Sequence, residues 1–269
     1  MGVYLVRGVL LSALLLPVGA LQADEPPAIT IIIDDMGNHQ AQGLAALELR
    51  GAVTYAFLPH TPYAAALAEK AHGLGKEVML HLPMDAHEGN ALGPGALTLH
   101  MTEVQFKRTL LDNLNAIPHV SGLNNHMGSL LTRHPGAMGW IMQALTAARS
   151  GLYFIDSRTT RETVAQQVAE EYSVPNTRRD VFLDNDPSVD AIEKQFSVLL
   201  QRARQQGYAV GIGHPYPQTV EVLRRVFTRL KSQNIQLISA SAMIELQQRR
   251  NSWPEPSFPL LKVAKSSKP

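Results

Sequence analysis

The chain has 269 residues, no cysteine, and 24 lysines and arginines against 23 aspartates and glutamates. This composition excludes disulfides, thiolate metal ligands and a cysteine nucleophile. The near-neutral charge argues against nucleic acid or an anionic surface as the principal partner. The length suits a single α/β domain of barrel size.

Residues 1–23 have the pattern of a signal peptide. Arg7 supplies a positive charge, residues 9–16 form an apolar run, and Ala20 or Ala23 offers a small residue for cleavage. We therefore expect an exported protein of the periplasm or cell envelope, and the loss of Arg7 would leave 23 basic against 23 acidic residues. The apolar run is too short for a membrane helix. An uncleaved signal anchor remains an alternative, and no later stretch reads as a membrane span.

Short apolar runs then alternate with helical stretches. The runs predict strands at residues 29–33, 52–58, 77–82, 120–123, 152–155, 181–183, 208–212 and 235–238. Helices are predicted at 63–72, 102–116, 135–149, 189–206 and 219–232. Thr102 and Gln105 predict a capping box, and Gly207 stands where a glycine ends a helix.

This alternation predicts parallel strands joined by right-handed crossovers, and seven or eight such units favour an irregular (β/α) barrel over an open sheet. No glycine-rich phosphate fingerprint follows the first strand, which disfavours a nucleotide-binding fold. Residues 24–250 are expected to form the barrel domain and residues 251–269 a disordered tail. Two stretches break the alternation. Residues 85–100 predict a long loop that shapes a groove, and residues 172–180 contain Arg178 and Arg179.

The first predicted strand ends in two acidic residues. Residues 29–33 are β-branched and apolar, as in a strand buried on both faces, and Asp34, Asp35 and Gly37 follow. Functional residues of parallel α/β folds lie at such carboxyl ends. Adjacent buried carboxylates repel each other unless a cation or a shared proton intervenes. The pair therefore indicates a functional site, although aspartate also suits a turn or a helix cap.

Polar residues also follow most of the other predicted strands, and in a barrel these strand ends converge on one pocket. They are His81 and Asp85 after the third strand, Asn124, Asn125 and His126 after the fourth, Asp156 and Arg158 after the fifth, Asp184 after the sixth and His214 after the seventh.

Two histidines with one carboxylate make a common open site for zinc or another divalent metal, which lowers the pKa of its bound water towards ~7. Asp35, His81 and His126 are the preferred ligand set, and zinc is the expected ion. Asp85 competes for a place, because it follows His81 by four residues. His126 could instead belong to a hydrogen-bonded turn with the two asparagines before it.

Five motifs occur in order over roughly residues 28–248: Ile-Asp-Asp-Met-Gly, His-Leu-Pro-Met, Asn-Asn-His-Met-Gly-Ser, Phe-Ile-Asp-Ser-Arg-Thr and Gly-Ile-Gly-His-Pro-Tyr-Pro. Together they resemble the divergent polysaccharide deacetylase family, an exported bacterial branch of the NodB-like carbohydrate esterases. The resemblance implies an irregular (β/α) barrel. It also implies metal-dependent hydrolysis of the carbon–nitrogen bond that holds an acetyl group on an N-acetylated sugar of a cell-wall or related glycan.

The resemblance implies roles for three residues. In the wider superfamily the first aspartate of the pair is the base and the second binds the metal, and these roles would fall on Asp34 and Asp35. The late-strand histidine, the acid, would be His214. Two other readings of His214 stay open: a cap for the next helix, or a metal ligand.

The motifs also depart from the wider superfamily's pattern. The usual second motif has two metal histidines four residues apart, whereas here His81 is followed by Asp85. The usual arginine-bearing motif is replaced by Asn125 and His126. The metal ligands must therefore differ from the usual set.

Placement at the strand ends suggests supporting roles for further residues. Asp156 or Asp184 could orient His214, and Arg158 could keep Asp34 ionised by its charge.

Three other functions compete with deacetylation. A non-catalytic periplasmic glycan-binding protein could keep the fold and lose turnover. A phosphoesterase would need more cationic groups than Arg158, Arg178 and Arg179 provide. A serine hydrolase using Ser129 or Ser157 lacks a nucleophile-elbow pattern.

Overall fold

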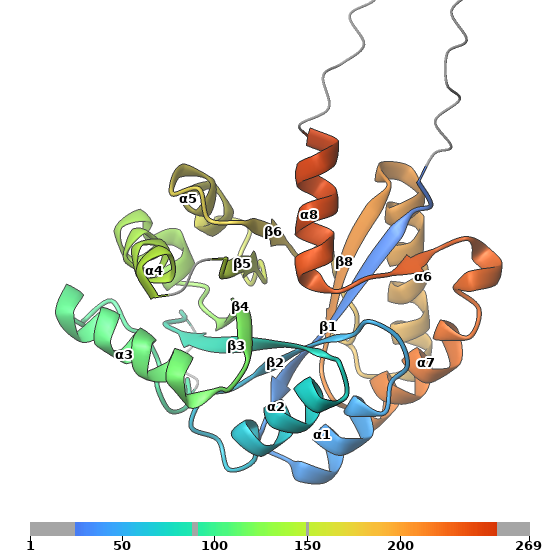
Figure 1. Ribbon diagram of the computed structural model, residues 1–269, viewed down its shortest axis with the longest axis horizontal. Coiled ribbons are helices and arrows are strands. Elements are labelled where there is room, and N and C mark those ends of the chain that lie inside the picture. The colour runs from blue at the N-terminus through green and yellow to red at the C-terminus, as the bar shows by residue number, and fades with distance from the viewer. Residues whose placement is uncertain (1–24, 88–90, 149–150, 252–269) are drawn as a thin grey trace, which may run out of the picture.

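The computed structural model describes residues 25–87, 91–148 and 151–251, and Figure 1 shows its elements. The strands are β1 (Ala28–Met36), β2 (Thr54–Phe57), β3 (Glu77–Met84), β4 (Val120–Met127), β5 (Tyr153–Asp156), β6 (Asn176–Arg178), β7 (Val181–Phe182), β8 (Tyr208–Gly213) and β9 (Gln236–Leu237). The helices are α1 (Gln40–Leu47), α2 (Ala64–Gly73), α3 (Glu103–Ala116), α4 (Pro135–Ala148), α5 (Ala165–Glu171), α6 (Val189–Gln206), α7 (Pro217–Phe227) and α8 (Ala240–Asn251), with 3₁₀ turns at Leu131–Arg133 and Lys231–Gln233.

The strands form one parallel sheet in the order β6-β5-β4-β3-β2-β1-β8-β7, and β9 pairs with the start of β1. The sheet curls strongly, and helices surround it (Figure 1). The prediction of an irregular (β/α) barrel is confirmed. The capping box of Thr102 and the left-handed Gly207 at the end of α6 are present as predicted.

The two edges of the curled sheet meet at a seam. β6 lies at one edge and β7 at the other, yet only Arg179 and Asp180 separate them in the chain. The Arg179 N–H donates to the carbonyl of Asp156 on β5, and the Asp180 N–H donates to the carbonyl of Val210 on β8. This short crossing links the two edges through the chain, although β6 and β7 are not paired with each other.

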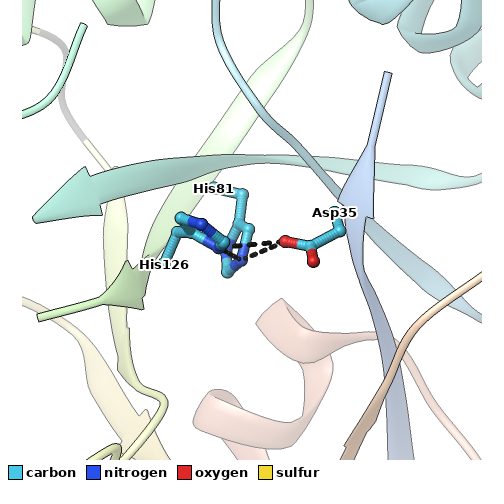
Figure 2. Close-up of side chains that lie close together, drawn as sticks. All are labelled: Asp35, His81 and His126. Atoms are coloured by element: carbon cyan, nitrogen blue, oxygen red, sulfur yellow. Dashed lines mark hydrogen bonds and ion pairs between the residues drawn. The ribbon is translucent and has the colours of Figure 1, made fainter. Parts of the chain in front are cut away.

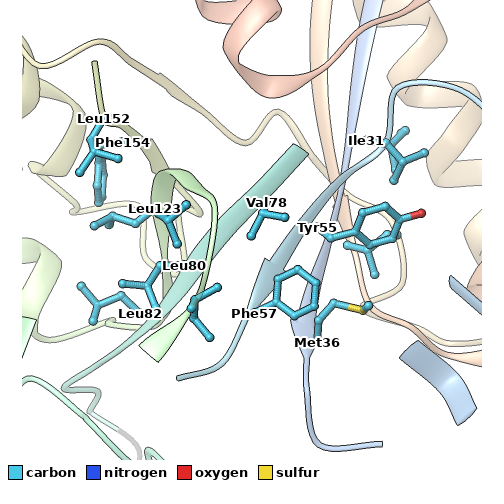
Figure 3. Close-up of a cluster of buried hydrophobic side chains, with 14 of the residues drawn as sticks. Ile31, Met36, Tyr55, Phe57, Val78, Leu80, Leu82, Leu123, Leu152 and Phe154 are labelled. Carbon is cyan, nitrogen blue, oxygen red and sulfur yellow. The ribbon is translucent and has the colours of Figure 1, made fainter. Parts of the chain in front are cut away.

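The strands bury side chains on both faces. Alternate residues of β1, β2 and β3 point outward, towards the surrounding helices, and Figure 3 shows part of this outer cluster. The labelled members are Ile31, Met36, Tyr55, Phe57, Val78, Leu80, Leu82, Leu123, Leu152 and Phe154. Because both faces are covered, the strands appear in the sequence as continuous apolar runs.

The concave face of the sheet has a core of its own, supplied by α8. Ala240, Met243 and Ile244 of this helix pack with inward residues of the strands, such as Ile32 and Ile212. The carboxylate of Glu77 accepts hydrogen bonds from the N–H groups of Ala240 and Ser241 at the start of α8. A carboxylate is favourable there because a helix leaves its first N–H groups without partners. The last helix thus fills one end of the barrel.

Several elements differ from the prediction. β1 extends three residues beyond 33, and α1, α5, α8 and β6 were not predicted. The predicted helix 219–232 is α7 followed by a separate 3₁₀ turn. None of the helices in the described ranges is long and apolar enough to cross a bilayer. The predicted signal peptide, 1–23, lies outside the described residues, as does the predicted tail after residue 251.

Candidate functional site

A β-bulge at the end of β1 brings two neighbouring carboxylates to the same side of the sheet. Ile33 pairs with Tyr55 and Met36 with Phe57, so Asp34 and Asp35 lie opposite a single residue of β2. Adjacent side chains of a regular strand point to opposite faces. Asp35 escapes this alternation with a φ of 54°, a left-handed value that is uncommon outside glycine but tolerated by aspartate. The bulge therefore allows both acids to face the concave side.

Asp35, His81 and His126 form a triangle of possible metal ligands (Figure 2). The Oδ1 atom of Asp35 lies 3.1 Å from Nε2 of His81 and 3.0 Å from Nδ1 of His126. The two imidazole nitrogens are 3.1 Å apart. β1, β3 and β4 each contribute one of the three residues.

The triangle fits a divalent metal. In tetrahedral zinc sites the ligand atoms lie about 2.0–2.2 Å from the ion and hence about 3.4 Å from one another, close to the spacing here. Apart from its ion-pair contacts with the two imidazoles, Oδ1 of Asp35 is buried without a hydrogen-bond partner among the described residues. His81 donates from Nδ1 to Oδ1 of Asn124 at 2.7 Å, which leaves Nε2 directed at the triangle. Metal-binding histidines commonly have such a second partner.

The two acids have opposite pKa shifts. Burial raises the pKa of the Asp34 carboxyl, against the opposing effects of His81, His214 and Asn124. Burial would also raise the pKa of Asp35, but the imidazoles of His126 and His81 outweigh it and hold that pKa below its usual range. Asp34 is therefore the stronger base, and Asp35 is ionised as a ligand must be.

Asn124, which accepts a hydrogen bond from His81, also holds Asp34 in place. Oδ1 of Asp34 accepts a hydrogen bond of 2.8 Å from the Asn124 amide. Oδ2 of Asp34 lies 3.7 Å from Nε2 of His81, beside the triangle. Asn124 thus links the possible ligand and the possible base.

His214 lies on the other side of Asp35. Its Nδ1 donates to Oδ1 of Asp184 at 2.9 Å, and its Nε2 lies 3.8 Å from Oδ2 of Asp35. Burial lowers the pKa of His214, but the hydrogen bond and charge of Asp184, with Asp35 and Asp34, raise it to about 9. The other Asp184 oxygen accepts from the His214 N–H and from Thr219. Asp184, not Asp156, is the carboxylate that orients this imidazole.

His214 lies outside the triangle, and this position argues against its role as a metal ligand. As for the capping role, α7 begins after Tyr216 without a side-chain cap.

Arg179 is the arginine whose pKa the negative charge of Asp34 acts to raise. Burial lowers its pKa, and the negative charges of Asp34 and Asp156 oppose this. Its guanidinium donates to the carbonyls of Ser157 and Arg158 and lies 4.9 Å from the ring centre of Phe182. The sequence suggested Arg158 for this place, but the Arg158 side chain lines a separate cavity.

The remaining predicted residues support the backbone around the site. Asp85 accepts from the Leu99 N–H and so holds the loop after β3, outside the triangle. Asn125 donates to the Met127 carbonyl and accepts from the Ser157 N–H, joining the ends of β4 and β5. Asp156 accepts from the Arg158 N–H and from the Thr163 hydroxyl.

A groove of about 190 Å³ opens beside the triangle. Asp35 and His126 line it together with apolar residues, among them Leu58, Pro59, Pro83 and Leu92. Leu92 belongs to the loop after β3, for which the sequence predicted a groove-shaping role. The groove suits a small group with an apolar part next to the triangle.

Tyr216 is a site residue that the sequence reasoning did not single out. Its ring stacks on that of His214 at 5.3 Å, and the residue is 39% exposed. Burial raises the pKa of its hydroxyl, and the charges of Asp35 and Asp184 add to this. The only signal was its place in the Gly-His-Pro-Tyr-Pro motif. An exposed aromatic ring at the rim can hold the apolar face of a sugar.

Comparisons with known proteins show the family of this chain and the proteins that share its fold. Residues 31–244 match the family model "Divergent polysaccharide deacetylase". The chain is 36% identical over 226 residues to the uncharacterized protein YibQ of Escherichia coli, covering 84% of this chain and 70% of that one. It is similar in structure to the uncharacterized protein ATU2773 of Agrobacterium tumefaciens, with a TM-score of 0.77, 20% identity and coverage of 81% and 89%. The peptidoglycan deacetylase PdaC of Bacillus subtilis shares the fold more distantly, with a TM-score of 0.51, 13% identity and coverage of 85% and 95%.

Proposed function

Because this chain belongs to the divergent polysaccharide deacetylase family, we propose that it is a metal-dependent hydrolase that removes acetyl groups from an N-acetylated glycan. The substrate class is suggested by the family and by the fold shared with a peptidoglycan deacetylase. One observation carries the proposal. A possible base, Asp34, and a possible acid, His214, lie on two sides of a triangle that fits a divalent metal.

Asp35, His81 and His126 would hold the ion. When bound, a divalent ion polarises a carbonyl and makes water more acidic, which is the activation that amide hydrolysis requires. Asn124 contributes by fixing the imidazole of His81 and the carboxylate of Asp34 at once. The ligand and the base thereby keep their relative positions through one amide group.

Asp34 accepts the proton of the attacking water. Its burial raises its pKa, so the carboxylate is a stronger base than an exposed aspartate. Oδ1 is occupied by Asn124, which leaves Oδ2, on the side of His81, to take the proton.

His214 supplies the proton that the departing amine needs. With a pKa of about 9 it carries that proton at neutral pH, and Asp184 keeps Nε2 facing the site. The apolar groove beside Asp35 receives the acetyl methyl group, and the Tyr216 ring supports the sugar.

Steady-state assays on acetylated chitooligosaccharides and peptidoglycan fragments, with Zn²⁺ added, test the proposal. We expect release of acetate that a chelator abolishes and that the Asp34→Asn variant loses. Arg224→Gln on α7 removes an exposed ion pair with Glu48, which follows α1; it is the matched control and should keep full activity. Glycan binding without acetate release would contradict the proposal and favour a non-catalytic glycan-binding protein.

We also propose that the protein is exported to the periplasm or cell envelope, on the strength of the pattern in residues 1–23. Mass spectrometry of protein from envelope fractions should give an amino terminus near Leu21 or Asp24. A cytoplasmic protein beginning at Met1 would contradict this.

A further inference from the structure

The seam of the barrel contains a second cavity, of about 520 Å³. It lies between β6 and α5 on one side and the start of β8 and α8 on the other. Its lining includes Thr177, Gln166, Tyr208 and Gln247. It shares no lining residue with the groove beside the metal triangle. Its volume is within the range of about 300–1,000 Å³ that small-molecule sites occupy.

Three arginines line this cavity, and their guanidinium groups could donate hydrogen bonds to a ligand. Arg158, Arg161 and Arg178 come from the turn after β5 and from the end of β6. Within the described part of the chain, none of the three guanidinium groups makes a hydrogen bond or an ion pair, although the charge of Arg158 acts on Asp156 and that of Arg178 acts on Asp180. Three acids also line the cavity, so its formal charge is balanced, but the three guanidinium groups bring many hydrogen-bond donors into one place.

Two of the carboxylates that line the cavity, those of Asp156 and Asp180, accept hydrogen bonds from other groups of the chain. Both oxygens of Asp156 accept hydrogen bonds, from the Arg158 N–H and from Thr163. Asp180 accepts from the Val210 N–H, and burial raises its pKa. Glu170 alone is exposed among the acids that line the cavity. The groups left for a ligand are therefore mainly donors.

We propose that the seam cavity binds an acidic ligand of sugar size, whose carboxylate or phosphate contacts Arg158, Arg161 and Arg178. Guanidinium groups bind both anions through paired N–H donors. The glutamine amides and the Tyr208 hydroxyl around them suit the hydroxyl groups of a sugar. This site is independent of the proposed deacetylation, because it uses none of the residues of the metal triangle.

Calorimetry on chelator-treated protein with three matched probes tests the proposal. Glucuronic acid carries a carboxylate, glucose 6-phosphate carries a phosphate, and glucose carries neither. We expect at least one acidic probe to bind with one site per chain and at least tenfold more tightly than glucose. The tighter of the two acidic probes identifies the anion.

The double variant Arg161→Gln, Arg178→Gln should weaken the acidic probe at least tenfold and leave the weak binding of glucose unchanged. Arg224→Gln, outside the cavity, should bind as the parent does. Circular dichroism establishes that the double variant is folded. Equal binding of glucose and both acidic probes overturns the proposal, as does acidic-probe binding that the double variant retains. Because no probe is turned over, these results do not depend on deacetylase activity.

Discussion

The surroundings of Asp34 and Asp35 separate two neighbouring carboxylates into two roles. Asp35 faces two imidazoles that lower its pKa, whereas Asp34 is buried beside Asn124 and has a raised pKa. Pairs of titratable groups whose pKa values are pushed apart are typical of acid–base sites.

Substitutions at the two positions should therefore have different effects. Asp35→Ala removes an anionic ligand and should abolish stoichiometric binding of a divalent metal. Asp34→Asn should leave the metal bound while kcat falls by about 10²–10⁴-fold, as for the loss of a general base. Metal analysis of the purified variants, together with rates, checks both outcomes. If both variants hold metal as the parent does, the ligand assignment is wrong.

His214 should make the stability of the metal-free protein depend on pH. Its folded pKa of about 9 is above the ordinary value of 6.5, so its pairing with Asp184 stabilises the protein fully below about pH 6.5. The contribution, on the order of 3 kcal/mol, is lost as the pH rises through about 9. Asp184→Asn should lower the pKa of His214 in an NMR titration. The difference in stability between parent and variant should also shrink above pH 9. A titration unchanged in the variant would show that Asp184 does not control this imidazole.

At the scale of elements, the end of β1 depends on backbone conformations that few residues adopt. Asp35 has a φ of 54° and Gly37 a φ of 122°. A Cβ atom at Gly37 would lie 2.2 Å from Oγ1 of Thr61 and 2.9 Å from Cβ of Ala64. The turn after the bulge thus requires glycine.

Gly37→Ala should destabilise the protein by about 1–3 kcal/mol, because it adds a clash to an unfavourable φ. Gly73→Ala is the control, since a Cβ at that position of α2 meets nothing within 4 Å. The control should be neutral or stabilising by up to about 1 kcal/mol. Urea unfolding curves give both values. Equal stability of the two variants would exclude a special requirement at Gly37.

The same elements show what a single sequence can predict. The β-branched run of β1 and the capping box of α3 are local signals, and both elements were predicted. β6 has three residues and α8 only a narrow apolar face, so neither has a strong local pattern. Polar groups at strand ends pointed to the site. The contact between His81 and Asn124, by contrast, depends on the register of β3 and β4, which only the folded sheet defines. Nothing local marks Arg179, rather than Arg158, as the arginine whose pKa the charge of Asp34 acts to raise.

On the scale of the whole molecule, α8 packs against the concave face of the sheet, with its first residues at the start of β3. Met243 and Ile244 belong to the buried cluster of the concave face, together with Ile32 of β1 and Met79 of β3. Residues that position a catalytic group are best held by a rigid, packed layer.

Met243→Ala should cost about 2–5 kcal/mol, because Met243 is fully buried and its loss leaves a cavity in the barrel. Leu74→Ala is the control, since Leu74 is 53% exposed, and it should change stability by less than about 0.5 kcal/mol. Thermal and urea unfolding measure both variants. A loss below 1 kcal/mol at Met243 would mean that α8 contributes little to the barrel.

The pairing of the first strand with the last elements has a consequence for how the chain is made. β1 lies between β2 and β8, and the hydroxyl of Thr30 donates to the carbonyl of Ile238, 208 positions later. A ribosome releases β1 first and α8 last. The apolar first strand therefore gains β2 early but lacks β8, its neighbour on the other side, until almost the whole chain has emerged. In an unfinished chain one edge of that strand is exposed. A chaperone of nascent polypeptides would be expected to bind this segment.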